Sequence, residues 1–142
     1  MITEKSCGAV VFTQDSGSIK YVIVESKEGY YGFPKGHTEG SETEEETAYR
    51  EIFEETGLSV RIIGDFRTED MHTFTIDGEI RMKYVVYFAA EYADQTPIPQ
   101  ISELNGLYLM DIETALSSLQ FESSKRILRE AHSFITNAIK NF

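Results

Sequence analysis

A helix with clear start and stop signals stands between segments that are typical of strands. Residues 41–44 and 43–46 each have the Ser/Thr-x-x-Glu spacing of a capping box, in which side chains bind the first free amides of a helix. Gly57 supplies the left-handed residue at which many helices end. The sequence therefore predicts a helix over residues 43–56, and the flanking segments must form a fold that packs against it.

The segments around this helix predict a sheet covered by helices. β-Branched and aromatic runs at residues 7–12 and 20–25 indicate a hairpin, and Asp77-Gly78 is a strong turn signal before another strand-like run. Apolar residues at three- and four-residue steps predict an amphipathic helix over 122–140. The expected fold class is α/β, a sandwich with a mixed sheet. Further expected elements are loops at 28–36 and 94–100, strands at 58–66, around 71–76, at 79–92 and at 106–110, and a helical turn at 111–118.

The composition is that of an ordinary globular domain. The chain has 142 residues, of which 41% are hydrophobic and 26% are charged, so we expect a single domain over residues 1–142. No apolar run approaches the roughly 18 residues of a membrane span, and the pattern MITEKSCGAVVF lacks the basic, apolar and small-residue order typical of a secretion signal, so none is expected. Cys7, the only cysteine, is expected to be a small buried strand residue. These features predict a cytoplasmic protein with no membrane partner.

Charge is distributed unevenly along the chain. With 13 Lys and Arg against 24 Asp and Glu, the formal net charge is −11, and no basic stripe is present, which argues against DNA or RNA as a partner. Residues 39–55 contain eight glutamates and one basic residue, Arg50, and so carry −7 of that total. Like charges one helical turn apart destabilise a helix by roughly 0.2 to 0.5 kcal/mol per pair. This segment therefore needs a compensating interaction.

Helical geometry at about 100° per residue sorts the segment into two faces. Its apolar stripe, which we expect to face the core, consists of Tyr49, Ile52 and Phe53. Glu51, Glu54 and Glu55 fall on the opposite side, so their carboxylates are expected to converge on an outward face. Arg50 borders this face within reach of Glu54, or of a neighbouring carboxylate that it can hold in place.

Two interpretations of the acidic face remain open at this point. A solvated polar face is the ordinary one, but such faces usually interleave lysine with glutamate, and no lysine lies between residues 39 and 55. The other interpretation is that a cation compensates the charge. Carboxylates and a backbone carbonyl are the hard oxygen ligands that Mg²⁺ prefers, and water and substrate phosphates commonly complete such sites. The sequence therefore favours a magnesium site that acts on a small-molecule polyphosphate.

One stretch resembles the signature of a known family. Gly36, Glu42 and the run REIFEETGL from Arg50 to Leu58 match every fixed position of the Nudix box, over 23 residues. The resemblance implies a Nudix-type α/β/α sandwich. It also implies a hydrolase that cleaves a pyrophosphate linkage in a nucleoside-diphosphate-linked substrate, using Mg²⁺ or sometimes Mn²⁺.

The resemblance further implies roles for the residues of the box. The expected metal ligands are the carbonyl of Gly36 and the carboxylates of Glu51, Glu54 and Glu55. Arg50 is expected to orient Glu51, and Glu42 to tie the loop to the helix. The water-activating base is one of the box carboxylates or a carboxylate from a later loop, for which Glu103 is the candidate; an ordinary loop carboxylate is the alternative for Glu103.

Two side chains beside Gly36 are candidates for substrate contact. Lys35 precedes the glycine and can contact a phosphate, and His37 follows it. A solvated side chain is the alternative for each of them.

Segments outside the box resemble the asymmetrical diadenosine tetraphosphate hydrolase branch, namely CGAVVF, FPKGHTEGSE, KYVVYF and LQFESSKRILREAHSFI. That branch holds an adenine between aromatic side chains. Candidates for the first of these two aromatic side chains are Phe74, Tyr84 and Tyr87; the alternative role for each is packing within the sheet. The second position aligns with Leu107, which cannot stack. This departure weakens the match and leaves nucleoside triphosphates, nucleotide sugars and a non-catalytic nucleotide-binding role as alternatives. Diadenosine tetraphosphate, cleaved to ATP and AMP, is the preferred substrate because the other segments resemble that branch.

Overall fold

The sheet of this protein is formed by strands that precede the first helix in the chain and by strands that follow it. The structure is a computed structural model that describes residues 2–140. Its elements in chain order are β1 (Ile2–Asp15), β2 (Ser18–Ser26), β3 (Tyr31–Gly32), β4 (Lys35–His37), α1 (Glu44–Thr56), β5 (Arg61–Ile76), β6 (Glu79–Glu91), β7 (Leu104–Met110), α2 (Ile112–Ser118) and α3 (Glu122–Lys140).

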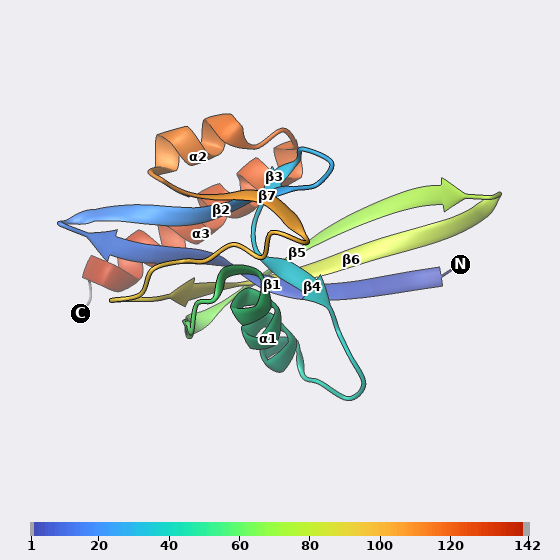
Figure 1. Cartoon of the computed structure of the whole chain (residues 1–142), viewed down its shortest axis with the longest axis horizontal. Coiled ribbons are helices and arrows are strands. Elements are labelled where there is room, and N and C mark those ends of the chain that lie inside the picture. Colours follow the sequence, from blue (N-terminus) through green and yellow to red (C-terminus); the bar gives the residue numbers. More distant parts are fainter. Residues whose placement is uncertain (1, 141–142) are drawn as a thin grey trace.

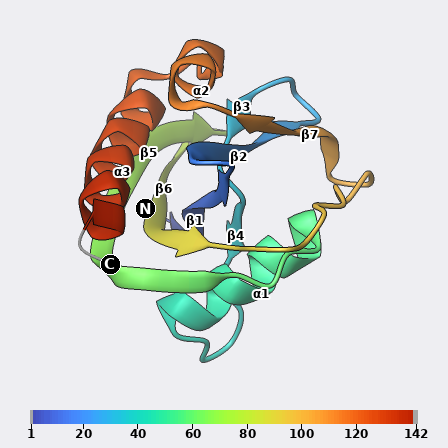
Figure 2. The same ribbon diagram turned by 90° about the vertical axis from the view of Figure 1, so that its left-hand side faces the viewer.

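β1 lies in the middle of a mixed sheet with the strand order β3-β2-β1-β6-β5. It pairs in parallel with β6 and antiparallel with β2 and β4. β2 also pairs antiparallel with β3 and β7, and β5 with β6. Figure 2 shows α1 and α3 on opposite sides of this sheet. The arrangement confirms the predicted α/β sandwich with a mixed sheet.

Alternation along β1 separates two buried clusters, one on each face of the sheet. Val10 and Phe12 pack with residues of α2 and α3, whereas Cys7, Ala9 and Val11 pack with residues of α1. Cys7 is fully buried, as the sequence predicts. The predicted apolar stripe of α3 faces the first cluster through the buried residues Ile127, Leu128, Ala131 and Ile135, with Ala138 and Ile139 partly buried.

The predicted loop at 28–36 is a correction, because the structure places two short strands near its end. β3 covers only Tyr31–Gly32, and β4 covers Lys35–His37. β1 provides the partner for β4, pairing Ser6–Gly8 with it in a stretch that β2 does not reach. Glycine and proline therefore limit the length of these strands but do not prevent them. This pairing fixes Gly36 beside α1.

β5 and β6 extend beyond the helices as a long hairpin, and with the first part of β1 they form a three-stranded arm (Figure 1). The hairpin turns at Asp77 and Gly78, whose φ angles are 52° and 77°. Two consecutive residues with positive φ are the hallmark of the turn that the Asp-Gly pair predicts. No described helix is long and apolar enough to span a membrane.

Candidate active site

The start and end of α1 follow the sequence signals. Thr43 is the N-cap: its hydroxyl accepts a hydrogen bond from the amide of Glu46, and the Glu46 carboxylate accepts one from the amide of Thr43. Of the two capping boxes that the sequence allows, the second is therefore formed. Gly57 ends the helix with a φ of 71°. Both ends of the helix that carries the acidic residues are thus fixed by caps.

The orientation of α1 differs from the prediction. Ile52 is buried as expected, but Tyr49 and Phe53 are 40% and 57% exposed. The buried side chains of the helix are Thr47, Ala48, Ile52 and Thr56. Small side chains on this face let α1 approach β1 and β4 closely, and no position is left there for an aromatic ring. The prediction of an apolar stripe through Tyr49 and Phe53 was therefore wrong.

This rotation turns two of the box carboxylates partly inward. Glu51 is only 16% exposed in its side chain, whereas Glu54 is 49% exposed. Glu55 is intermediate in exposure. The three carboxylates therefore do not share one outward face. Glu51 and Glu55 form the wall of a cleft, and Glu54 lies at its open rim.

Arg50 connects this wall to the loop before the helix. Its Nε and one terminal nitrogen donate to both oxygens of Glu42, at 2.6 and 2.9 Å, and that same nitrogen donates to the carbonyl of His37 at 2.9 Å. The other terminal nitrogen donates to Glu51 at 2.7 Å and lies 3.3 Å from Glu54. Arg50 lowers the pKa of Glu42 to about 2, with help from the amide of Glu39. These are the contacts that the sequence led us to expect for Arg50 and Glu42.

Gly36 lies directly against the Glu51 side chain. A Cβ at position 36 would lie 2.0 Å from Cδ and Oε2 of Glu51, far inside van der Waals contact. Only glycine therefore lets the backbone of β4 approach this carboxylate.

Glu55 is the most strongly perturbed carboxyl group in the cleft. Burial raises its pKa to about 7, and the nearby charges of Glu51 and Glu103 act in the same direction. The amide of Lys35, which donates to Oε1 of Glu55 at 3.2 Å, acts against this shift, as does the Lys35 charge. A buried carboxylate beside further carboxylates is stabilised by a cation.

The residues of this wall fit a hard divalent cation. As the side chains stand in the described residues, no three His, Cys, Asp or Glu groups are gathered closely enough to enclose a metal ion. Arg50 holds Glu51, and the Lys35 amide holds Glu55, so these carboxylates are turned toward protein donors. Oxygen-only donors, and carboxylates close enough to Glu55 to raise its pKa, nonetheless match what Mg²⁺ or Mn²⁺ requires. The ligand roles of Gly36, Glu51, Glu54 and Glu55 remain predictions.

The carboxylates form one wall of a cleft of about 950 Å³. Its lining comes from nearly every part of the fold, including β2, β3, β4, β5, β6 and the residues before β7 and α3. Five of the predicted site residues outside α1 line it, namely Lys35, Gly36, His37, Tyr87 and Glu103. The pairing of β4 with β1 and the course of the loop before β7 bring these distant residues together.

Lys35 and Lys83 lie near each other in this cleft, which Lys27 also lines. Burial lowers the pKa of Lys35, and neighbouring Lys83 on β6 acts in the same direction, whereas Glu55 raises it. Two ammonium groups near each other are donors of the kind that phosphate oxygens accept hydrogen bonds from. Lys83 could not be identified from the sequence, because its place on the cleft face depends on the register of β6 with β1 and β5.

The predicted aromatic residues are placed differently from what the sequence suggested. Tyr87 lines the floor of the cleft but is only 5% exposed, and it packs edge-on against Phe33. Tyr84 lies on the other face of the sheet with the α1 cluster, beneath the Lys5 ammonium group, so its assignment to the substrate site is corrected. Phe74 is on the arm and is not among the residues that line the cleft. Alternation along β6 puts Tyr84 and Tyr87 on opposite faces of the sheet, whereas Phe74, which pairs with Arg81, lies further out along the arm.

Tyr30 and Phe121 are aromatic residues of the cleft that the sequence analysis missed. They are 53% and 45% exposed, and their ring centroids are 5.2 Å apart. Tyr30 precedes β3, and Phe121 immediately precedes α3, so they are distant in the chain. The available signal was that both are aromatic residues in turn segments, where a buried ring is not expected. At the aligned second position, Leu107 packs against the α1 cluster and Tyr108 contacts Tyr31.

Comparison with known proteins agrees with this architecture. A family model described as the NUDIX domain matches residues 3–131. The chain therefore belongs to the Nudix family, and it is a pyrophosphohydrolase of that family, as the sequence predicted.

Individual relatives are similar over nearly the whole chain. The mouse bis(5'-nucleosyl)-tetraphosphatase [asymmetrical] is 29% identical over 92% of this chain and 95% of its own length. The fold is similar to the crystal structure of a C. elegans Ap4A hydrolase binary complex, with a TM-score of 0.83 and 21% identity over 94% of this chain and 98% of that one. It is also similar to the E. coli dihydroneopterin triphosphate pyrophosphohydrolase, with a TM-score of 0.72 and 14% identity over 92% and 97% of the two chains.

Proposed function

We propose that this Nudix hydrolase cleaves a dinucleoside polyphosphate, with diadenosine tetraphosphate as the preferred substrate and ATP and AMP as products. The observation that carries the proposal is the cleft in which the box carboxylates of α1 face Lys35 and Lys83. The names of the mouse and C. elegans relatives point to the same substrate class. The single buried cysteine fits a cytoplasmic site of action.

The metal ligands in this proposal are the Gly36 carbonyl and the carboxylates of Glu51, Glu54 and Glu55. Mg²⁺, or Mn²⁺ in its place, supplies charge neutralisation and polarises the phosphoanhydride when bound. Arg50 keeps Glu51 turned toward Gly36. One of the box carboxylates or Glu103 accepts the proton of the attacking water. The water oxygen forms the new bond to phosphorus, and the bridging oxygen leaves with the other product.

The cations and aromatic rings of the cleft account for substrate binding. Lys35 and Lys83 contact the phosphate chain, and His37 lies at the same wall. Tyr30 and Phe121 provide exposed rings on which a nucleobase can stack. Stacking on an aromatic side chain is worth about 1 to 3 kcal/mol per base. In this role they replace the aromatic residues that the sequence suggested.

The test is a substrate panel in ¹⁸O-labelled water with Mg²⁺. The panel contains diadenosine tetraphosphate, nucleoside triphosphates and nucleotide sugars, and the products and the labelled phosphate are identified by mass spectrometry. We expect ATP and AMP from diadenosine tetraphosphate, with kcat/KM at least about tenfold above that for the other substrates. Glu54→Gln and Glu55→Gln are expected to lose this activity, and Glu45→Gln, on the same helix, to retain it.

Other results of the substrate panel or of the variants would change the proposal in three different ways. Preference for a triphosphate or a nucleotide sugar would replace the substrate but keep the site. Full activity in Glu54→Gln and Glu55→Gln would remove these residues from the mechanism. Nucleotide binding without turnover of any substrate would leave a non-catalytic binding module.

A further inference from the structure

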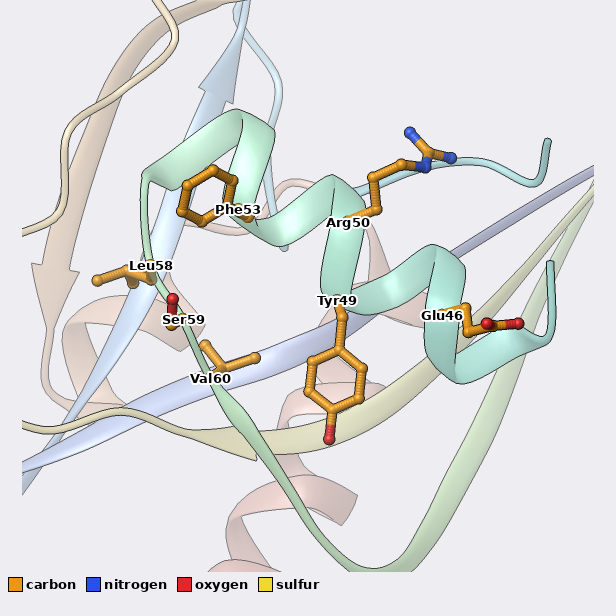
Figure 3. Close-up of a pocket in the computed structure, with 7 residues that line it drawn as sticks. All are labelled: Glu46, Tyr49, Arg50, Phe53, Leu58, Ser59 and Val60. Carbon is orange, nitrogen blue, oxygen red and sulfur yellow. The ribbon is translucent and has the colours of Figure 1, made fainter.

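A second hollow lies on the outer side of α1, away from the cleft (Figure 3). α1 forms one wall of this groove, and the segment that leads into β5 forms the other. Its lining residues are Glu46, Tyr49, Arg50, Phe53, Leu58, Ser59 and Val60. Apart from Arg50, none of them belongs to the site proposed for hydrolysis.

The groove exposes apolar surface that a helix of this kind normally buries. Phe53 and Tyr49, one turn apart, are 57% and 40% exposed, and Leu58 forms a buried floor. Ile98, 69% exposed, lies 3.6 Å from where a Cβ at Gly57 would stand, so apolar surface continues past the end of the helix. Scattered single apolar residues are ordinary on protein surfaces, whereas a contiguous group marks an interaction site.

Hydrogen bonds hold the walls of the groove in place. The Tyr49 hydroxyl accepts a hydrogen bond from the amide of Ile62 at 3.1 Å, which fixes the ring across the space between α1 and β5. The Gln95 side chain binds both the amide and the carbonyl of Ser59, at 2.9 and 2.8 Å. A partner therefore meets a preformed surface, and little ordering entropy opposes binding.

The charge around the groove selects the chemistry of the partner. Glu46 lines the groove, and Glu45 is exposed on the adjoining turn. Arg50 does not offset them, because its guanidinium group binds Glu42 and Glu51, and Figure 3 shows it directed away from Tyr49. In a two-fold dimer this acidic face would meet its own copy, and the chain carries a net charge of −11. A basic partner is therefore favoured over a second copy.

We propose that this groove docks a segment of a partner protein in which apolar side chains are flanked by lysine or arginine. The apolar side chains enter between Phe53, Tyr49 and Val60, and the basic residues contact Glu45 and Glu46. Aromatic residues in preformed pockets are typical binding hot spots. The groove and the cleft lie on different sides of α1, so docking leaves the hydrolytic site accessible.

The test measures binding of three fluorescent peptides by anisotropy. The basic probe is Lys-Lys-Leu-Phe-Lys-Phe-Leu-Lys-Lys; one comparison peptide has Glu in place of Lys, and the other has Ser in place of Leu and Phe. We expect only the basic probe to bind. Phe53→Ser and Glu45→Lys are each expected to weaken this binding at least about tenfold, with hydrolytic activity unchanged. Ile80→Ser removes an equally exposed apolar side chain from the arm and is the matched control.

Three outcomes would overturn the proposal. The first is that the basic probe does not bind at concentrations up to about 1 mM. The second is that the probe binds Phe53→Ser as tightly as the unaltered protein, which would mean that the probe binds in the acidic cleft. The third is that sedimentation shows a dimer of the unaltered protein and a monomer of Phe53→Ser, which would make a second copy of the chain the occupant of the groove. Loss of peptide binding with normal turnover, or the reverse, separates this proposal from that of the hydrolytic function.

Discussion

Arg50 places the three carboxylates of the α1 wall in three different environments. It binds Glu51 directly, touches Glu54 only at 3.3 Å, and makes no contact with Glu55 among the described hydrogen bonds. The Glu51 carboxylate is therefore held by Arg50, Glu54 is half exposed, and Glu55 is partly buried with a raised pKa. Three chemically identical side chains within one and a half helical turns are thus prepared for different tasks, which supports a division of roles among them.

Replacing Gly36 by alanine tests the fit between β4 and this wall. The added Cβ would overlap the end of the Glu51 side chain, which is flexible, so the carboxylate is expected to move and the fold to persist. We expect Gly36→Ala to weaken Mn²⁺ binding, measured by electron paramagnetic resonance, at least about tenfold, or about 1.4 kcal/mol. The melting temperature is expected to change by only a few degrees, because the overlap is with a side-chain end.

Gly32→Ala is the matched control for this change. Gly32 is on β3, the strand before β4 in the chain, and lines the same cleft, and a Cβ there meets nothing within 4 Å. Unchanged Mn²⁺ affinity in Gly36→Ala would show that Glu51 does not need its present position to bind metal. An equal loss in both variants would point to a general disturbance of the cleft.

The limits of α1 could be predicted from the sequence, but the direction of its faces could not. Caps act within a few residues, so Thr43, Glu46 and Gly57 are visible as local signals. The choice of buried face depends on how closely the helix approaches β1 and β4, and there Ala48 and Thr47 fit where Tyr49 does not. Hydrophobic periodicity gives a large aromatic residue as much weight as a small one, which is why it failed here.

Substitution of the N-cap separates the two capping boxes of the sequence. Thr43→Ala removes the hydroxyl that accepts from the Glu46 amide and is expected to lower the free energy of unfolding by about 1 kcal/mol. Ser41→Ala, in the box that does not form, is expected to stay within about 0.5 kcal/mol of the unaltered protein. Urea denaturation measures both values. The assignment of the cap would be reversed by a larger loss in Ser41→Ala.

Contacts between elements also decided which aromatic residues reach the cleft. The sequence pointed to the strands after the box, but Tyr30 comes from the turn before β3 and Phe121 from the residue before α3. The Nudix box could be recognised from the sequence because its residues lie on one helix and the loop before it. The cleft's opposite wall is assembled from segments up to about ninety residues apart, and their meeting depends on strand register, which local patterns do not encode.

The contact between β2 and α3 predicts a pH dependence of stability. The Tyr21 hydroxyl lies 2.6 Å from Nδ1 of His132, and burial lowers the pKa of His132 below its ordinary value of 6.5. The unfolded chain therefore takes up a proton at a higher pH than the folded protein does. The resulting contribution to stability is present above about pH 6.5 and is lost as the pH falls through that value.

Thermal melts between pH 5 and 8 test this contribution. His132→Gln is expected to flatten the fall in melting temperature below about pH 6.5. Tyr21→Phe keeps the buried imidazole and is expected to retain that fall, although it loses the hydrogen bond. If His132→Gln and the unaltered protein have parallel profiles, His132 does not contribute to the pH dependence.

The net charge of −11 and the acidic wall of the cleft cause electrostatic repulsion within the folded protein. Screening by salt relieves this repulsion over the whole surface. A divalent cation held in the cleft would do more, because it would bind the folded protein at one place, where Glu55 is partly buried near other carboxylates. The two effects can be separated, since only the second requires particular residues.

Melting in Mg²⁺ and in Na⁺ at equal ionic strength makes this separation. About 10 mM MgCl₂ matches the ionic strength of about 30 mM NaCl, and a tenfold excess of Mg²⁺ over its dissociation constant stabilises by about 1.4 kcal/mol. For a chain of this size, that corresponds to a rise of about 4 °C in melting temperature beyond the rise in NaCl. Combined replacement of Glu51, Glu54 and Glu55 by glutamine is expected to abolish the difference between the salts. If the difference persists in that variant, the cation binds elsewhere on the acidic surface, and the assignment of the α1 wall as the metal site fails.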